Sequence, residues 1–220
     1  MKLIPIDQRL KDIASLVDNC DFVADIGTDH GYLPIYLIQK NQAKKAIASD
    51  VAIGPLNKAI ENIEKYQLND VIETRLCSGL TKIPSDVHTV IMAGMGANLI
   101  VDILKEAKYK YQTYLLQANL NVNVLRKYLT ENNYMIVDEK VTYVNKKYYE
   151  ILKVKIGHQK LTELEIKYGP INLKNKSEIF VKKYLSIVDN YKRILKDFKG
   201  SQEEYTRLNN EINEILEMLK

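Results

Sequence analysis

Acidic side chains follow predicted strands at positions where a nucleotide-like ligand could bind. Residues 22–26 are apolar except for Asp25, a pattern typical of a buried strand. The run ends at Gly27, and Asp29 and Gly31 follow before an apolar segment with helical spacing. A strand, a glycine turn and a helix in this order make a ligand site, because glycine lets the backbone approach a ligand and the helix amino end offers unpaired N–H groups.

The charge of this turn separates two classes of ligand. A dinucleotide site has Gly-x-Gly-x-x-Gly, which places a pyrophosphate against bare backbone. Asp29 takes the place of the second glycine, and its carboxylate has the wrong charge for a phosphate. S-adenosylmethionine has no phosphate and carries a sulfonium and an ammonium group, for which Asp25 and Asp29 have the right charge. The turn therefore favours S-adenosylmethionine, although an ordinary strand-to-helix connection could show a similar pattern.

A third acid, Asp50, ends the second predicted strand, residues 44–50. It lies about 20 residues beyond the glycine turn, where Rossmann-type folds place a carboxylate on the ribose hydroxyls. The same aspartate could instead cap the next helix, which we expect to begin around Pro55. Taken together with Asp25 and Gly27, the spacing favours ribose binding.

A second glycine turn follows the fourth predicted strand, residues 89–93. Gly94 and Gly96 flank Met95 and lead into a helix predicted over residues 98–108. Glycines directly after a strand indicate close approach of the backbone to a ligand. Strand four lies beside strand one in this type of sheet, so both glycine turns should share one crevice at the carboxyl ends of the strands.

Five further residues could border this crevice, and each has a simpler alternative. Gln117 and Asn119 follow the fifth predicted strand, and their amides could read the edge of a base or cap the following helix. Arg9 could lie over the pocket or could be a solvated or salt-bridged arginine. Gly79 and Leu80 could border an adenine ring, or Gly79 could be a simple turn glycine.

The predicted elements fit one architecture. Strands and helices alternate through five βα units, which a strand pair over residues 134–140 and 148–156 closes. This is the outline of the class I, Rossmann-like methyltransferase domain, an α/β fold with a seven-stranded sheet whose last strand is antiparallel. The first helix is predicted over residues 7–19 with Asp7 as its N-cap. We expect this domain to cover residues 1–160.

The remaining residues, 161–220, are predicted to form a second, helical domain. Apolar residues recur at steps of three and four on both sides of Gly200, which predicts an antiparallel coiled-coil hairpin. Residues 174–199 contain eight Lys or Arg and three acids, whereas residues 203–217 contain five acids and one arginine. These charges could pair between the two helices, or the basic helix could bind RNA phosphates. The cations that would bind RNA are Lys182, Lys183, Lys192, Arg193 and Lys196.

The composition excludes several classes of protein. No apolar run approaches the roughly 20 residues of a membrane span, and the first residues lack a signal-peptide layout. Cys20 and Cys77 are too few for a disulfide framework, and no Cys/His spacing indicates zinc. We therefore expect a cytoplasmic protein without a metal. The net charge of +4 is compatible with an RNA partner without indicating one.

The motifs of the chain resemble those of the bacterial tRNA (adenine 22, ring nitrogen 1)-methyltransferases, the TrmK family. The resemblance covers nearly the whole chain and is most specific in the first glycine turn, Asp25-Ile-Gly-Thr-Asp-His-Gly31. The other matching motifs are Arg9-Leu10, Ser49-Asp50, Gly79-Leu80, Ala93-Gly-Met-Gly96, Leu115-Leu-Gln117 with Asn119, Leu125-Arg126, Tyr149-Glu-Ile-Leu152 and Gly169-Pro170. Ala97 departs from a family glycine and Ala118 from a family proline. Both replacements are small, so we expect only slight changes of loop geometry.

The resemblance implies transfer of a methyl group from S-adenosylmethionine to ring nitrogen 1 of a tRNA adenine. It assigns Asp25, Gly27 and Thr28 to the amino-acid end of the cofactor and Asp50 to its ribose. The full set of expected cofactor-binding residues is Arg9, Asp25, Gly27, Thr28, Asp29, Gly31, Asp50, Gly79, Leu80, Ala93, Gly94, Met95 and Gly96.

The target base has its own set of candidates. Asp29 and His30 are expected to orient the adenine or its exocyclic amine, although His30 could be a structural hydrogen-bonding residue. With Gln117 and Asn119 they make up the catalytic candidates. The implied partner is tRNA, bound by a monomer. Two alternatives stay open: a methyltransferase of another RNA or a small molecule, and a cofactor-binding or coiled-coil interaction protein without turnover.

Overall fold

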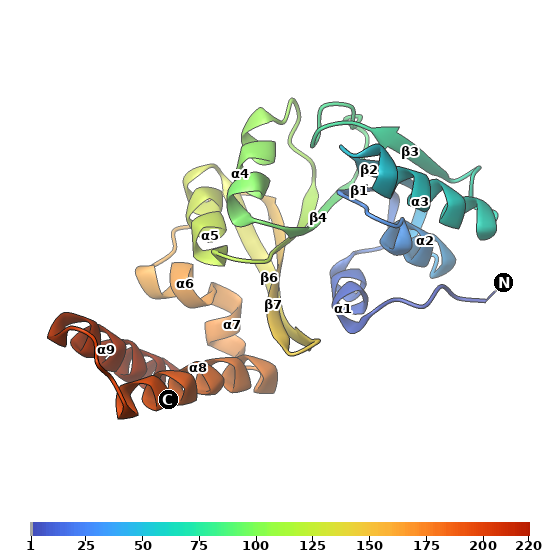
Figure 1. Cartoon of the computed structure of the whole chain (residues 1–220). Coiled ribbons are helices and arrows are strands. Elements are labelled where there is room, and N and C mark those ends of the chain that lie inside the picture. Colours follow the sequence, from blue (N-terminus) through green and yellow to red (C-terminus); the bar gives the residue numbers. More distant parts are fainter. Residues whose placement is uncertain (1) are drawn as a thin grey trace. The chain divides into compact units, whose positions relative to one another are not determined.

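A computed structural model describes residues 2–220, and in this part of the chain seven strands form a single sheet (Figure 1). The strand order is β3-β2-β1-β4-β5-β7-β6, and β7 is antiparallel to both of its neighbours. This confirms the expected class I methyltransferase sheet. The strands are β1 Cys20–Ile26, β2 Ala43–Asp50, β3 Ile72–Leu76, β4 Thr89–Met95, β5 Thr113–Ala118, β6 Tyr134–Val144 and β7 Lys147–Ile156.

Helices cover both faces of the sheet, because alternate residues of each buried strand point to opposite sides. Val23 belongs to the core under α1 and α2, whereas Ala24 belongs to the core under α4 and α5. Asp7 caps α1 as predicted, since its Oδ1 accepts a hydrogen bond from the Leu10 amide at 2.8 Å. The helices of this part are α1 Gln8–Leu16, α2 Tyr32–Gln39, α3 Ile53–Lys65, α4 Ala97–Glu106 and α5 Val122–Glu131.

The chain reverses its direction of winding between β1 and β4, which pair in parallel with Val23 opposite Thr89. Successive strands run from β1 to one side of the sheet and from β4 to the other. A crevice opens at such a switch point beyond the carboxyl ends of the strands. Both glycine turns leave the sheet there, as the sequence analysis predicted.

A buried ionic cluster anchors the end of this first unit to two short helices, α6 Glu163–Tyr168 and α7 Pro170–Asn175. Arg126 is completely buried, donates a hydrogen bond to Glu139 at 2.8 Å and binds Glu150. Its guanidinium also donates to the carbonyl oxygens of Ile166 and Lys167. The division between compact units therefore falls between residues 171 and 172, later than the expected boundary at residue 160.

The second unit, residues 172–220, is a helical hairpin formed by α8 Glu178–Lys196 and α9 Gln202–Leu219. Ser177 and Ser201 cap the two helices through their side chains. The residues buried between α8 and α9 confirm the predicted apolar stripes; they are Phe180, Tyr184, Val188, Leu208, Ile212 and Ile215. The Tyr191 hydroxyl donates to Glu211 across the hairpin at 3.3 Å.

Candidate functional site

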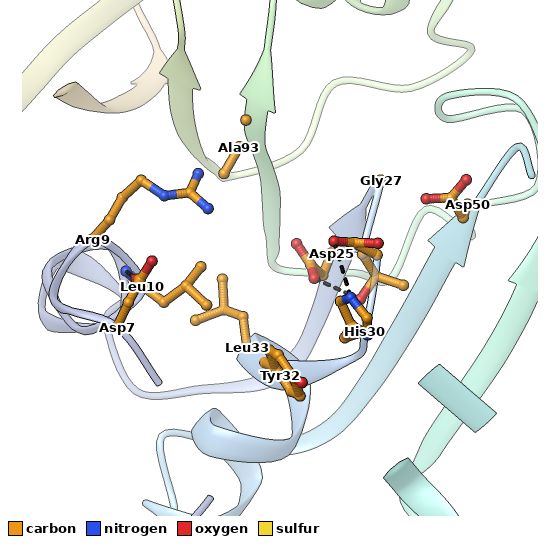
Figure 2. Close-up of a pocket in the computed structure, with 13 residues that line it drawn as sticks. Asp7, Arg9, Leu10, Asp25, Gly27, His30, Tyr32, Leu33, Asp50 and Ala93 are labelled. Atoms are coloured by element: carbon orange, nitrogen blue, oxygen red, sulfur yellow. Dashed lines mark hydrogen bonds and ion pairs between the residues drawn. The ribbon is translucent and has the colours of Figure 1, made fainter. Parts of the chain in front are cut away.

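A cavity of about 510 Å³ opens beyond the carboxyl ends of β1, β2 and β4 (Figure 2). This volume lies within the range of small-molecule and cofactor sites. The predicted cofactor residues that line it are Arg9, Asp25, Gly27, Thr28, Asp29, Asp50, Ala93 and Gly94. His30 lines it as well. The cavity thus brings together residues from both glycine turns, the end of β2 and the first helix.

Asp25 is the most buried acid of this cavity, with 6% of its surface exposed. Burial raises the pKa of its carboxyl to about 6, against opposing contributions from the Thr28 hydroxyl and the Arg9 charge. The Thr28 hydroxyl donates to the Asp25 carboxyl at 2.7 Å. A carboxyl held in this way gains from a bound cation, because the cation replaces the water that burial has removed.

Glycine at position 27 suits both the backbone conformation of this turn and the space beside it. Gly27 has φ +74°, and a Cβ there would lie 2.5 Å from Cε of Met95. The amides of Gly27 and Thr28 donate to the Ser49 carbonyl at 2.8 and 2.9 Å, which fastens the turn to the end of β2. Met95 and Gly27 therefore bring the two glycine turns into contact.

The second glycine turn is held by side-chain amides. Gly94 has φ +80° and lies at a break in the β4–β5 register. Its amide donates to Oε1 of Gln117 at 3.1 Å, and its carbonyl accepts from Nδ2 of Asn119 at 2.7 Å. Arg9 donates to the same Gln117 oxygen at 2.6 Å, and Gln117 donates to Asn119 at 3.1 Å.

This network corrects one expectation. Gln117 is completely buried and its amide is used inside the protein, so it cannot read the edge of a base directly. The alanine before Asn119 does not displace this residue from the Gly94 turn, because the backbone N–H of Asn119 also donates to the Met95 carbonyl at 2.7 Å. Gln117 and Asn119 instead shape the Gly94 turn and hold Arg9 at the cavity.

Asp50 lines the cavity, as a ribose-binding carboxylate would. One of its carboxylate oxygens accepts from the amide of Ala52 at 2.8 Å, and Ala52 is itself the N-cap residue of α3. Among the described residues, 2–220, no side chain caps this helix, so the alternative that Asp50 caps α3 is wrong.

Asp29 and His30 form the outer rim of the cavity. Asp29 has φ +51°, and its carboxylate lies 3.4 Å from Nε2 of His30. The His30 ring stacks on Tyr32, with ring centroids 5.1 Å apart. The Asp29 side chain is 69% exposed, so its carboxylate is free to meet an incoming base.

Several predicted cofactor residues lie away from the lining of the cavity. Gly31, with φ +70°, begins α2 and packs against Ala59. Gly79 packs against Ile103, and Leu80 belongs to the core beneath α4. Met95 and Gly96 follow the lining residue Gly94, and Gly96 is the N-cap of α4.

The cavity is also lined by four residues that the sequence did not indicate as ligand contacts: Asp7, Leu10, Tyr32 and Leu33. Leu10 and Leu33 have the helical apolar spacing of core residues, which carries no signal of a cavity. Tyr149 was also missed, although its ring lies under the Arg9 guanidinium at 5.6 Å. Tyr149 belongs to the family motif Tyr149-Glu-Ile-Leu152, but its local sequence is otherwise that of an ordinary strand residue and indicates no ligand contact.

The basic residues proposed for RNA all lie on α8, in the second unit. Lys192, Arg193 and Lys196 are exposed, and within residues 2–220 none of them forms an ion pair with α9. Lys182 pairs with Glu178 of its own helix at 2.5 Å. Pairing between the two helices therefore does not account for the basic residues at the end of α8.

Two features are absent from residues 2–220. This part of the chain contains no group of three His, Cys, Asp or Glu side chains that could hold a metal ion. None of its helices has both the length and the hydropathy needed to cross a membrane.

Comparisons with known proteins agree on one family. The sequence profile of TrmK, described as tRNA (adenine(22)-N(1))-methyltransferase, matches residues 23–220. The tRNA (adenine(22)-N(1))-methyltransferase of Bacillus subtilis is 32% identical over 194 residues, which cover 84% of this chain and 82% of the relative.

Two solved structures extend the similarity to the whole fold. TrmK of M. capricolum, in complex with S-adenosylhomocysteine, is 33% identical with a TM-score of 0.85 and 97% of each chain covered. A Streptococcus pneumoniae protein in complex with S-adenosyl-L-methionine is 34% identical with a TM-score of 0.88, covering 98% of this chain and all of its own.

Proposed function

The chain belongs to the TrmK family of tRNA (adenine(22)-N(1))-methyltransferases, and we propose that the cavity between its two glycine turns is where the methyl group is transferred. The protein is an S-adenosylmethionine-dependent enzyme that modifies ring nitrogen 1 of adenine 22 in tRNA. The observation that carries the proposed location is the buried Asp25 carboxyl beside the bare Gly27 backbone, with Asp50 on the same cavity.

The residues of the cavity fit the charges of the cofactor. S-adenosylmethionine supplies an electrophilic methyl group on a sulfonium, next to an amino-acid end that carries an ammonium and a carboxylate. Asp25 is suited to the ammonium and Arg9 to the carboxylate, since both line the cavity with opposite charges. The outer oxygen of Asp50 is suited to the ribose hydroxyls, because its other oxygen is already held by Ala52.

The target adenine needs positioning more than activation. Its ring nitrogen carries a lone pair and is itself the nucleophile, so the enzyme must align the reacting atoms and stabilise the positive charge of the product. Asp29 is suited to both tasks: its exposed carboxylate can accept a hydrogen bond from the exocyclic amine and lies at the cavity where the charge develops. Nε2 of His30 lies 3.4 Å from the Asp29 carboxylate, and the His30 ring stacks on Tyr32. The base must leave its helix first, because the target nitrogen is on the pairing edge.

We further propose that the two units of the chain bind different parts of the substrates, a division of labour between them. The first unit, residues 1–171, binds the cofactor and the target base, and the basic residues of α8 bind tRNA phosphates outside the target. Lys192, Arg193 and Lys196 support this role, because all three are exposed and none of them forms an ion pair within residues 2–220. We propose that the enzyme acts as a monomer in the cytoplasm, where its tRNA substrate is found.

One assay tests the activity and the proposed site together. Purified protein is incubated with labelled S-adenosylmethionine and unmodified bacterial tRNA, and the nucleosides are then analysed. We expect 1-methyladenine at position 22; its absence would refute the tRNA activity and leave a small-molecule methyltransferase or a non-catalytic protein.

The same assay under single-turnover conditions locates the transfer site. We expect Asp29→Ala to lower the rate at least about tenfold, while the cofactor Kd stays within about twofold, because the carboxylate acts on the target rather than on the cofactor. Asp102→Ala, at an exposed acid of α4 (63% exposed), is the control. Equal rates for the two variants would place the transfer elsewhere.

A further inference from the structure

The tip of the β6–β7 hairpin, residues 143–149, has an unusual composition for a connection between strands. It reads Tyr-Val-Asn-Lys-Lys-Tyr-Tyr, with three tyrosines, two lysines and no acid. We call these residues the hairpin tip. None of them lines the cofactor cavity, and the activity described above assigns them no role.

The hairpin tip lies at the same edge of the sheet as the cavity. Glu150 of β7 pairs with Ala118, the last residue of β5, so residues 143–149 extend past the carboxyl end of that strand (Figure 1). The Tyr149 ring lies 5.6 Å from the guanidinium of Arg9, which lines the cavity. The tip therefore begins one side chain away from the proposed transfer site.

Its reach matches a few nucleotides. From Tyr149 to Lys147, where β7 begins, the strand spans about 7 Å at the usual rise of roughly 3.3 Å per residue, and the two turn residues lie beyond it. Stacked nucleotides advance about 3.4 Å along one strand. RNA that places its target adenine in the cavity would thus have its neighbouring nucleotides within reach of the tip.

Two aromatic rings of the tip form an exposed platform. Tyr143 and Tyr148 face each other across the hairpin, and their ring centroids are 4.5 Å apart. Tyr143 is 49% exposed. In the described residues, 2–220, neither hydroxyl has a hydrogen-bond partner. A pair of tyrosines held together without being buried offers a ring face on which an unpaired base can stack.

The turn adds two free cations. Asn145 and Lys146 have φ +51° and +63°, as the two central residues of a tight hairpin turn require. Lys146 and Lys147 are both exposed, and within residues 2–220 neither of them forms an ion pair. With no acid among residues 143–149, the charge of the tip suits a polyanion and disfavours an acidic protein surface.

Building on the tRNA methyltransferase activity, we propose that the hairpin tip is a tRNA-binding surface. An unpaired base next to the target adenine stacks on the Tyr143–Tyr148 pair, while Lys146 and Lys147 contact the phosphates that flank it. Stacking of the neighbour compensates for the stacking lost when the target base leaves the helix, so the tip favours the RNA conformation that the cavity requires.

The test measures tRNA affinity of the full-length enzyme alongside cofactor affinity. For the double variant Tyr143→Ala/Tyr148→Ala we expect the tRNA Kd to rise about tenfold, the effect of losing one stacked base. The S-adenosylmethionine Kd should stay at the wild-type value. Tyr143→Phe/Tyr148→Phe retains both rings and should keep the tRNA Kd within about twofold of wild type.

The lysines are tested by salt dependence. For Lys146→Gln/Lys147→Gln, we expect the slope of log Kd against log salt concentration to fall by about 1.4 to 1.8, because each of the two phosphate contacts contributes roughly 0.7 to 0.9. This variant changes no ring. It therefore decides the proposal even if the alanine variant lowers the thermal unfolding midpoint.

The matched control lies at the opposite edge of the sheet. Tyr109 is also exposed (38%), and Lys108 lies over its ring, just before β5 begins. Lys108→Gln/Tyr109→Ala should leave both affinities unchanged. Wild-type enzyme that methylates tRNA, together with tip variants that behave like this control, would overturn the tip proposal alone. Wild-type enzyme that fails to methylate tRNA would overturn the activity on which it rests.

Discussion

At the residue scale, the burial of a single carboxyl dominates the electrostatics of the cavity. A nearby cation would stabilise the ionised form of Asp25, which burial disfavours. The guanidinium of Arg9, at the cavity wall, already donates a hydrogen bond to Gln117. The site is thus prepared for a positively charged ligand group. The ammonium of the cofactor meets this need, and a phosphate would not.

This environment predicts that cofactor binding depends on pH. The pKa of Asp25 in the free protein is about 6, so the carboxyl is protonated below that pH and binds an ammonium poorly. We expect the cofactor Kd, measured by calorimetry between pH 5 and 8, to fall as the pH rises through about 6. Asp25→Asn should weaken binding at pH 8 and remove this step; a step of the same size in the variant would assign it to another group.

The raised pKa of Asp25 also predicts that, in the absence of cofactor, the Asp25→Asn variant is more stable than the wild-type protein. A carboxyl whose pKa rises on folding, from 3.8 to about 6, favours the folded state below pH 3.8, and that contribution is lost as the pH rises through 6. The loss amounts to roughly 3 kcal/mol above pH 6. Asp25→Asn avoids it, so urea unfolding of the cofactor-free variant at pH 8 should show higher stability than wild type.

At the element scale, the two glycine turns constrain each other. Gly27 requires a positive φ, and the Met95 side chain fills the space that a Cβ would need. The turns after β1 and β4 are thus in contact with each other in the protein without a ligand. The loop after β3 packs Gly79 against Ile103, and none of its residues is among those that line the cavity.

A double-mutant cycle separates backbone strain from this contact. Gly27→Ala should destabilise the protein by about 1–2 kcal/mol from the positive φ, with a smaller addition from the contact with Met95, because the Met95 Cε is the end of a flexible side chain and can move. Adding Met95→Ala to the Gly27→Ala variant should remove the cost of the contact and leave the cost of the positive φ. Additive effects in chemical denaturation would mean that the two turns do not touch.

The ionic cluster at Arg126 is the element that fastens α6 to the sheet. Its single positive charge is shared by two buried carboxylates, Glu139 and Glu150, and a Cβ at Gly169 would lie 2.5 Å from both oxygens of Glu139. Gly169 has φ +94°. Both the conformation and the space therefore require glycine at the entrance to α7.

Removing the arginine should be costly because two buried carboxylates would lose the positive charge that both of them contact. We expect Arg126→Met to lower the free energy of unfolding by about 3–5 kcal/mol. Combining it with Glu139→Gln and Glu150→Gln should recover part of this loss, since the uncompensated charges are gone. Denaturation at constant pH distinguishes this from a simple loss of packing, for which the added substitutions would bring no recovery.

At the scale of the whole molecule, the two units predict separable defects. Replacing Lys192, Arg193 and Lys196 by Gln should raise the tRNA Kd and lower its salt slope by about 2 to 3, while the cofactor Kd is unchanged. Asp50→Ala should do the reverse and weaken cofactor binding about tenfold. Arg207→Gln, which removes a cation of α9, serves as the control for the first variant. Loss of cofactor affinity in both would contradict the division of labour.

Much of this architecture could be predicted from the sequence because it depends on local signals. The strand–glycine–helix order, Asp7 as an N-cap and the two apolar stripes of the tail are all short-range patterns, and the structure confirms them. The placement of both glycine turns in one crevice followed from the usual strand order of such folds.

Only the tertiary structure decided which of these residues meet. Gln117 appeared free to read a base until its burial among Arg9, Gly94 and Asn119 showed otherwise. Tyr149 gained significance because β7 pairs with β5 and brings its ring to Arg9. The contacts of Arg9 with Gln117 and Tyr149 join residues more than a hundred positions apart, and no local periodicity records them. The sequence by itself determined the fold, the cofactor class and the family; the packing of distant strands decided which side chains face the ligand and which hold the turns in place.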